Sequence, residues 1–174
     1  GGGFHRYSTD ERWLVPHFEK MLYDNAQLAV SYLEAWQVTH DAFYKNVACD
    51  ILNYVLRDMR DPVGAFYSSE DADSEGAEGK YYLWDKEEIM HILGPEDGRD
   101  CCAYYAVRGE GNFTSHEPYH KGRNILHTSP ESDRSGKSDF GRLAAWKEKL
   151  LNARNSRTRP GIDDKVITAW NAMM

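Results

Sequence analysis

The segment from Pro16 to Gln37 is apolar around most of a helical circumference, and this pattern constrains the fold more than any other feature of the chain. A helix that is apolar nearly all round is buried among other elements. The remaining polar residues recur at steps of three and four, so they share one face. We therefore predict a buried helix over residues 16–37 whose polar face borders a cavity or a strip of solvent. That face consists of His17, Lys20, Asp24, Gln27 and Ser31.

Residues 41–60 carry their apolar side chains on one face, which is typical of an outer helix with its other side in solvent. An acidic loop follows at residues 69–78. Asp85 and Glu88 form a capping box for a helix that runs through Leu93. Further helices are predicted over residues 100–105, over residues 139–155 and from about Asp163 onward, with an irregular loop through most of residues 95–138.

Helices of two kinds thus alternate along the chain, one amphipathic and one buried with a polar face. An antiparallel helical barrel produces this alternation, because its outer helices meet solvent and its inner helices meet each other and a central cavity. The predicted fold is all-α and part of such a barrel, and a plain helical bundle is the alternative. The family resemblance described below makes the expected barrel an (α/α)6 barrel with long loops. Because the helices are too few to close such a barrel, we expect residues 1–174 to be a fragment of one barrel domain.

Composition excludes several classes of protein. The net charge of −7 argues against a nucleic-acid partner, which would require a basic face. The apolar runs are only a few residues long, so no membrane span is expected. Three cysteines, two of them adjacent, do not make a disulfide scaffold, and they favour a reducing, cytoplasmic location.

The first twenty-four residues concentrate the side chains that sugar and acid–base sites use. Paired glycines permit a tight turn or the close approach of a ligand. His, Arg, Asp, Trp, Glu and Lys all follow within this short stretch. A surface loop followed by a buried helix with one hydrated edge is the other interpretation that the spacing leaves open.

Three segments make the chain resemble the spermatogenesis-associated protein 20 family and its bacterial relatives, which are long thioredoxin-domain proteins. The segments are GGGFHRYSTDERWLVPHFEKMLYDNAQLA, GAFYSSEDADSEGAEGKYYLW and IDDKVITAWNAMM, in the family's order. The resemblance implies an N-terminal thioredoxin-like domain followed by a barrel similar to N-acylglucosamine 2-epimerases and six-hairpin glycosidases. The chain has no C-x-x-C motif, so the thioredoxin-like domain and the rest of the barrel are expected to be absent from it.

What the resemblance implies for function is sugar chemistry of the epimerase, isomerase or glycosidase type, by acid–base catalysis and without a cofactor. The alternative is a non-catalytic barrel that binds a glycan or a protein and accompanies the redox domain. The expected partners are a sugar-like small molecule and either the remainder of the parent chain or a second copy. The candidate catalytic residues are His17, His5, Asp24, Glu70 and Asp71. The candidate substrate-binding residues are Arg6, Asp10, Trp13, Lys20, Gln27, Asp73, Tyr81, Trp84, Asp164, Lys165 and Asn171.

Two motifs suggest metals but lack the residues that metals need. Asp71, Asp73 and Glu75 fall near EF-hand loop positions, but Tyr82 stands where the bidentate carboxylate belongs. A solvated acidic loop, or a cluster of carboxylates at the rim of a cavity, are the interpretations that remain. His116-Glu117-Pro118-Tyr119-His120 matches H-E-x-x-H, but its proline and the glycines around it argue against the required helix. We expect a loop with two exposed histidines, and no metal site.

The cysteines carry no motif for reactivity. Cys49 falls on the polar side of its predicted helix near the core edge, and Cys101 and Cys102 lie in a short helix without a nearby base. All three are predicted to be structural.

Overall fold

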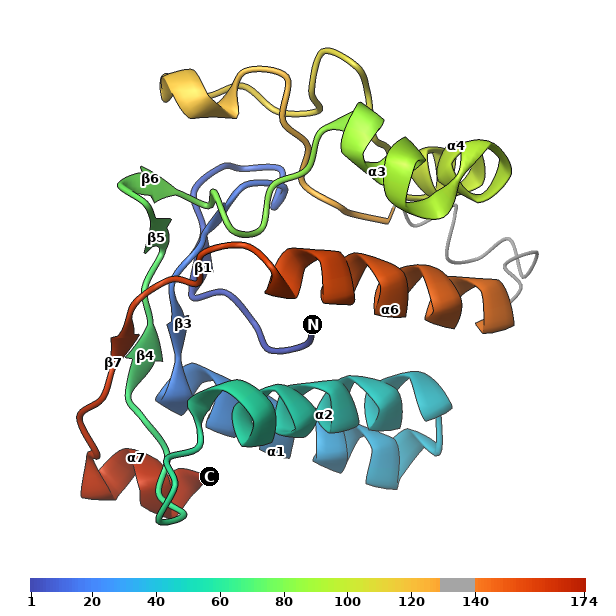
Figure 1. Cartoon of the computed structure of the whole chain (residues 1–174). Helices are drawn as coiled ribbons and strands as arrows, with labels where there is room; N and C mark the ends of the chain where they lie inside the picture. Colours follow the sequence, from blue (N-terminus) through green and yellow to red (C-terminus); the bar gives the residue numbers. More distant parts are fainter. Residues whose placement is uncertain (129–139) are drawn as a thin grey trace. The chain divides into compact units, whose positions relative to one another are not determined.

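The computed structural model describes residues 1–128 and 140–174 (Figure 1). The chain divides into two compact units, each assembled from segments that are distant in the sequence. Unit 1 contains residues 1–7, 16–73 and 160–174, and unit 2 contains residues 8–15 and 74–159.

Unit 1 is built on a helical hairpin of α1 (Leu22–Thr39) and α2 (Ala42–Tyr54). His40 ends α1 in the left-handed conformation, and its backbone N–H donates to Trp36 O at 2.8 Å. The Asp41 side chain then caps α2 by accepting a hydrogen bond from Phe43 N. A π-helical turn, η1 (Val55–Met59), continues directly from α2.

A three-stranded antiparallel sheet crosses the same unit in the order β3-β4-β7. Its register places Lys20 opposite Glu70 and Ser69 opposite Asp163. Glu70 thus lies between Lys20 and Ile162, which are 142 positions apart in the sequence. Its strands are β3 (Lys20–Met21), β4 (Ser69–Glu70) and β7 (Ile162–Asp163), and two smaller sheets pair β1 (Tyr7–Ser8) with β2 (Pro16–His17) and β5 (Asp73–Ser74) with β6 (Ala77–Glu78).

The opening glycines pack the first residues of the chain against α2. Gly2 and Gly3 both have positive φ, at 76° and 72°. A Cβ on Gly2 would overlap the carbonyl oxygen of Asp50, and one on Gly3 would overlap the ring of Tyr54. The predicted need for close approach is therefore real, but the neighbour is the protein's own helix.

The core of unit 1 joins α1, the end of α2 and the last helix, α7 (Thr168–Met173). Leu22, Tyr54 and Met59 are almost completely buried. Trp170 of α7 packs against this core, and the centroids of its ring and the Tyr23 ring of α1 are 4.8 Å apart.

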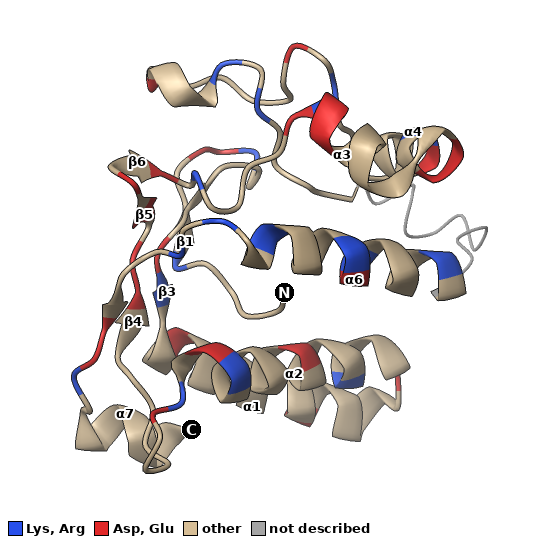
Figure 2. Ribbon diagram, in the orientation of Figure 1, with Lys and Arg blue, Asp and Glu red and all other residues tan. Residues whose placement is uncertain are grey.

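In the described part of unit 2, three longer helices surround a separate core. Asp85 accepts a hydrogen bond from Glu88 N, which confirms the predicted cap of the first of them. Glu87 and Glu88 lie in the first turn of that helix, where acidic side chains interact favourably with the positive end of the helix dipole (Figure 2). The elements are α3 (Lys86–Leu93), α4 (Pro95–Tyr104), a 3-10 turn η2 (Pro118–His120) and α6 (Phe140–Asn155), and the core includes Trp84, Ile89, Cys101, Cys102, Trp146 and Leu150.

The all-α barrel prediction is wrong. The structure is 48% helical and 11% strand, the described residues form three small sheets, and the fold is of mixed α/β type. Of the two surroundings predicted for the polar face of α1, a cavity or a strip of solvent, the exposed side chains of Gln27 and Ser31 match the second. Both side chains hydrogen-bond to carbonyls of their own helix.

Several predicted helix boundaries are also wrong. The helix expected from Pro16 begins at Leu22, because residues 16–21 form β2 and β3. The helix expected from Asp163 begins at Thr168, because Ile162 and Asp163 form β7. The helix expected at residues 100–105 begins at Pro95, which occupies the first helical turn as proline can.

Other predicted elements are confirmed. The helix over 41–60 is observed as α2 followed by η1. The helix over 139–155 is observed as α6, and its expected cap, Asp139, lies outside the described residues. Over residues 1–128 and 140–174, no helix combines the length and apolar character that crossing a bilayer requires.

Candidate functional site

The candidate site is built on two extended segments of unit 1 that run side by side. Arg6 N donates to Glu19 O at 2.9 Å, and His5 Nδ1 donates to Phe18 O at 2.9 Å. Side chains alternate along an extended segment. Phe18 and Lys20 are accordingly buried, whereas His17 and Glu19 lie on the opposite, partly exposed face.

On the partly exposed face, Glu19 joins two basic side chains. Its Oε2 lies 2.9 Å from an Arg6 guanidinium nitrogen and 3.6 Å from His17 Nε2. The hydrogen bond that Arg6 donates to Glu19 raises the pKa of Arg6, which therefore stays cationic. The Tyr7 ring stacks on the His17 imidazole with 4.9 Å between centroids, which fixes the ring plane.

Asp24, in the first turn of α1, is the electrostatic neighbour of this group. Its Oδ2 is buried and has no hydrogen-bond partner within the described part of the chain. Burial raises the pKa of the Asp24 carboxyl above its ordinary value; Arg6 opposes the rise and Glu19 reinforces it. We call Arg6, His17, Glu19 and Asp24 the acid–base cluster.

The cluster holds the components that proton transfer needs. A carboxyl with a raised pKa is suited to donate a proton, and the imidazole of a histidine is a common proton acceptor. Arg6 supplies a fixed positive charge that can orient an oxygen of a bound molecule. Carboxyl groups in different surroundings can take different roles in one reaction.

Lys20 and Glu70, both predicted as site residues, lie instead in a buried network. Tyr54 Oη donates to Glu70 Oε2 at 2.7 Å. Lys20 Nζ donates to Gly2 O at 2.9 Å and lies 4.3 Å above the Tyr54 ring centroid. Lys20 and Glu70 are about 95% buried, so their charges and hydrogen bonds hold the N-terminal segment, α2 and the sheet together.

The structure does not bring the rest of the predicted acidic rim to the cluster as side-chain partners. Asp71 and Asp73 are exposed, and Asp71 Oδ1 accepts a hydrogen bond from Asp73 N at 3.3 Å. Asp164 is exposed in the turn after β7 and not on an inner helix. Lys165 forms an ion pair with Asp163.

Asn171 has a structural position. Its side chain accepts a hydrogen bond from Phe66 N at 2.8 Å and donates to Phe66 O at 3.0 Å. These two bonds tie α7 to the segment before β4. His5, the second candidate acid or base, has its Nδ1 engaged with the Phe18 carbonyl, and its ring packs edge-on against Phe18.

Four predicted binding residues belong to unit 2 and not to the cluster. Asp10 accepts backbone hydrogen bonds from Val15 and Leu14, which lower the pKa of its carboxyl and close the loop of residues 8–15. Trp13 is 85% exposed within that loop. Tyr81 and Trp84 are buried, and the Trp84 ring is covered by the Arg157 guanidinium at 4.0 Å.

The metal-like motifs do not assemble ligands. His116 is exposed as predicted, but His120 is buried, which corrects the expectation of two exposed histidines. His120 Nε2 donates to Glu78 O, and its Nδ1 lies 2.8 Å from Ser115 Oγ, so both ring nitrogens are engaged. Among the described residues, no group of three or more His, Cys, Asp or Glu side chains is arranged to hold a metal ion.

Sequence reasoning missed Glu19, which connects the cluster. The signal was the spacing of two between His17 and Glu19, because an extended strand places such residues on one face. The helical interpretation instead grouped His17 with Lys20, and the strand places those two on opposite faces.

Comparison with known proteins adds relatives but no named activity. No protein-family model matches the chain. It is 41% identical over its whole length to human spermatogenesis-associated protein 20, and 38% identical to the mouse protein of that name. It is also 34% identical, over 99% of its length, to an uncharacterized protein of Caenorhabditis elegans.

The chain spans about a quarter of the length of these curated relatives, 25% of each mammalian protein and 27% of the nematode protein. Over its full length, the chain is therefore a homologue of one quarter of spermatogenesis-associated protein 20.

Proposed function

We propose that the acid–base cluster carries out proton transfer on a polyhydroxylated, sugar-like substrate, as part of a longer protein. The observation that carries this proposal is the Asp24 carboxyl, buried at Oδ2, unpartnered within the described residues and raised in pKa beside Arg6 and Glu19. Perturbed carboxyls with a specific charge partner are typical of functional sites. The proposal needs no barrel and no cofactor.

The reaction proposed is epimerisation or isomerisation next to a carbonyl. A base removes the proton from the carbon beside the carbonyl, and an enediolate forms with its negative charge on oxygen. An acid returns a proton to the other face of the carbon or to the neighbouring carbon. We assign Asp24 to proton donation, His17 to proton removal and Arg6 to binding the developing oxyanion. Glu19 positions His17 and Arg6 through its carboxylate.

The test uses the full-length protein that contains this chain and a panel of aldoses, ketoses and N-acylated amino sugars in deuterated water. Deuterium incorporation at the carbon next to the carbonyl, followed by NMR, reports proton transfer directly. Asp24→Asn and His17→Gln are each expected to slow the exchange by about 100-fold or more, the usual size of a general acid–base contribution. Asp50→Asn is the matched control, because Asp50 is exposed on α2.

Equal exchange rates in the Asp24 and Asp50 variants would overturn the assignment of Asp24. Absence of exchange with every sugar in the panel, in a folded protein, would overturn the sugar chemistry. A shift in the acidic or basic limb of the rate–pH profile in Asp24→Asn distinguishes proton transfer from a purely structural effect.

A second candidate function, a non-catalytic protein-binding part of a longer protein, is favoured by an apolar groove on unit 1. The groove has a volume of about 280 Å³ and lies along α1, α2 and the end of α7. Val30, Leu33 and Leu52 line it, and each is 41–48% exposed. Contiguous exposed apolar surface marks contact with another surface. We assign that surface to the further chain that the fourfold longer relatives possess.

Cys49 provides the test, because it is exposed and lines the same groove. We expect iodoacetamide to modify Cys49 in the 174-residue chain and much more slowly in the full-length protein. Cys101 and Cys102 are the internal control for folding, since both are buried and react only if the chain unfolds. Equal rates at Cys49 in the two proteins would contradict this function and leave the acid–base proposal unaffected.

A further inference from the structure

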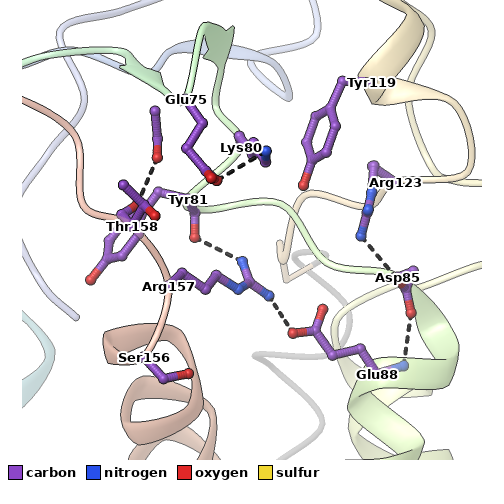
Figure 3. A pocket seen from close by; sticks show the side chains of 11 residues that line it. Glu75, Lys80, Tyr81, Asp85, Glu88, Tyr119, Arg123, Ser156, Arg157 and Thr158 are labelled. Carbon is purple, nitrogen blue, oxygen red and sulfur yellow. Dashed lines mark hydrogen bonds and ion pairs between the residues drawn. The ribbon is translucent and has the colours of Figure 1, made fainter.

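Unit 2 contains a pocket of about 500 Å³ that shares no residue with the acid–base cluster (Figure 3). It lies between the turn after β5, the segment before α3, the 3-10 turn η2 and the end of α6. A volume of this size is in the range of small-molecule sites. The pocket is open to solvent on one side, so an occupant would remain partly hydrated.

Three ion pairs line the pocket, and they balance its charge. Lys80 pairs with Glu75 at 2.9 Å. The other two pairs are Arg123 with Asp85 at 2.8 Å and Arg157 with Glu88 at 2.7 Å. An anionic ligand would have to compete with three carboxylates, and a cationic ligand with three basic groups. The lining therefore favours a neutral ligand whose groups both donate and accept hydrogen bonds, which is the property of hydroxyls.

The floor of the pocket is held in place before any ligand binds. One Arg157 nitrogen donates to the carbonyls of Tyr81 and Leu83, both at 2.8 Å, and the guanidinium stacks on Trp84. Asp85 is fixed as the cap of α3. Groups that are already ordered lose little conformational entropy on binding.

Tyr119 provides a hydroxyl that no described residue uses as a hydrogen-bond partner. Its ring lies between two basic side chains, with Arg123 at 4.7 Å and Lys80 at 5.4 Å from the ring centroid. Figure 3 shows the hydroxyl end of Tyr119 directed into the pocket between these two residues. The ring is partly exposed, so its edge is available to the C–H groups of a ligand.

We infer that this pocket binds a neutral saccharide of one or two rings, with Tyr119, Lys80 and Arg123 as its binding residues. The saccharide hydroxyls accept hydrogen bonds from Lys80 and Arg123 and donate to Glu75 and Asp85. The Tyr119 hydroxyl bonds to a further ring oxygen. This inference goes beyond the proposed proton transfer, because it concerns a different site in a different unit.

The test is saturation-transfer NMR and calorimetric titration of the full-length protein with neutral sugars, namely glucose, mannose, N-acetylglucosamine, maltose and cellobiose. Tyr119→Phe removes one hydroxyl and is expected to weaken binding roughly threefold to tenfold, the size of a neutral hydrogen bond. Lys80→Met is the second variant, and it should weaken binding without altering the pocket floor. Lys121→Met is the matched control, because Lys121 is exposed nearby and does not line the pocket.

The sugar affinities of the two variants and the control test the inference. Saturable sugar binding that both variants weaken and the control retains would support it. Binding unaffected in both variants, no binding of any of the sugars, or displacement of the sugar by inorganic phosphate would overturn it. Asp24→Asn should leave this binding unchanged, and Tyr119→Phe should leave deuterium exchange at saturating sugar unchanged, so the two proposals fail separately.

Discussion

Tyr54 donates a hydrogen bond of 2.7 Å to the Glu70 carboxylate, and both residues are at least 95% buried. The bond joins the end of α2 to the central strand of the small sheet. A buried carboxylate is costly unless it is hydrogen-bonded, so this contact decides where β4 sits. Gly3 also lies against the Tyr54 ring, and Lys20 Nζ lies 4.3 Å from the ring centroid, so Tyr54 contacts three separate segments of unit 1.

Tyr54→Phe is expected to lower the free energy of unfolding by about 1–2 kcal/mol, since it removes one partner of a buried charged group and leaves the ring. Urea unfolding followed by circular dichroism measures the change. Tyr44→Phe, also on α2, is the control and should have little effect because its ring contacts do not involve the hydroxyl. An effect no larger than that of the control would show that Glu70 does not depend on Tyr54.

Gly3→Ala is expected to destabilise unit 1 by about 2 kcal/mol or more, because the new Cβ would overlap the Tyr54 ring and the backbone has φ of 72°. Gly161→Ala is the control, since its φ is not positive and its nearest neighbour, Asp71, lies at ordinary contact distance. Thermal unfolding of the two variants measures the difference. Equal melting temperatures would mean that residues 1–3 do not pack on α2.

Asp24→Asn is expected to raise the melting temperature at neutral pH by about 2 °C, because it removes the free-energy cost of burying an ionised carboxylate. The folded-state pKa of Asp24 is raised, so its carboxyl favours folding in the protonated form. That stability is fully present below the unfolded pKa and is lost as pH rises through the folded pKa. The difference between variant and wild type should therefore shrink on acidification.

Thermal unfolding at a series of pH values tests this dependence, with Asp50→Asn as the exposed control. A variant that is less stable than wild type at neutral pH would indicate that the Asp24 carboxylate is satisfied by a contact outside the described residues. The same variant is the one used for deuterium exchange, so stability and catalysis are compared in one protein.

Cys101 should resist alkylation in the folded protein at pH 8. Burial raises the pKa of its thiol to about 12, so only about one thiol in ten thousand is ionised at that pH. Burial also raises the pKa of the Cys102 thiol. Mass spectrometry of peptides after iodoacetamide treatment measures both, and denaturant should make both react. Rapid modification of Cys101 without denaturant would contradict the buried position.

Local signals in the sequence identified some elements and not others. Asp85 with Glu88 marked the start of α3 correctly, because a side-chain cap is a contact between near neighbours. The helix predicted over residues 41–60 was also correct, because one face of α2 is in solvent and its apolar residues therefore show a clear helical periodicity. The helix predicted from Pro16 failed because six residues are too few to distinguish strand from helical periodicity when apolar residues are dense.

The residues of the candidate site were likewise predicted only in part. His17, Arg6 and Asp24 were chosen from residue type and are brought together, but Glu19, which connects two of them, was not recognised. Lys20 was chosen from the same predicted helix face as His17, and Glu70 was chosen from the acidic loop, yet both are buried around Tyr54. The alternation of an extended segment decides which side a residue faces, and one wrong period reverses that side.

The sequence by itself determined the helix over residues 41–60, the cap at Asp85 and the need for small residues at Gly2 and Gly3, because each depends on local geometry. Only the tertiary structure decided that β3, β4 and β7 pair, that Tyr54 satisfies Glu70, and that Glu19 joins Arg6 to His17. The contacts of Arg6 with Glu19, Tyr54 with Glu70 and Ser69 with Asp163 join residues that are 13 to 94 positions apart in the sequence. The entropic cost of closing such loops is offset only when the whole core forms. Packing and buried hydrogen bonds then favour one arrangement of these segments. Local sequence patterns do not predict that arrangement, because it depends on residues far apart in the chain.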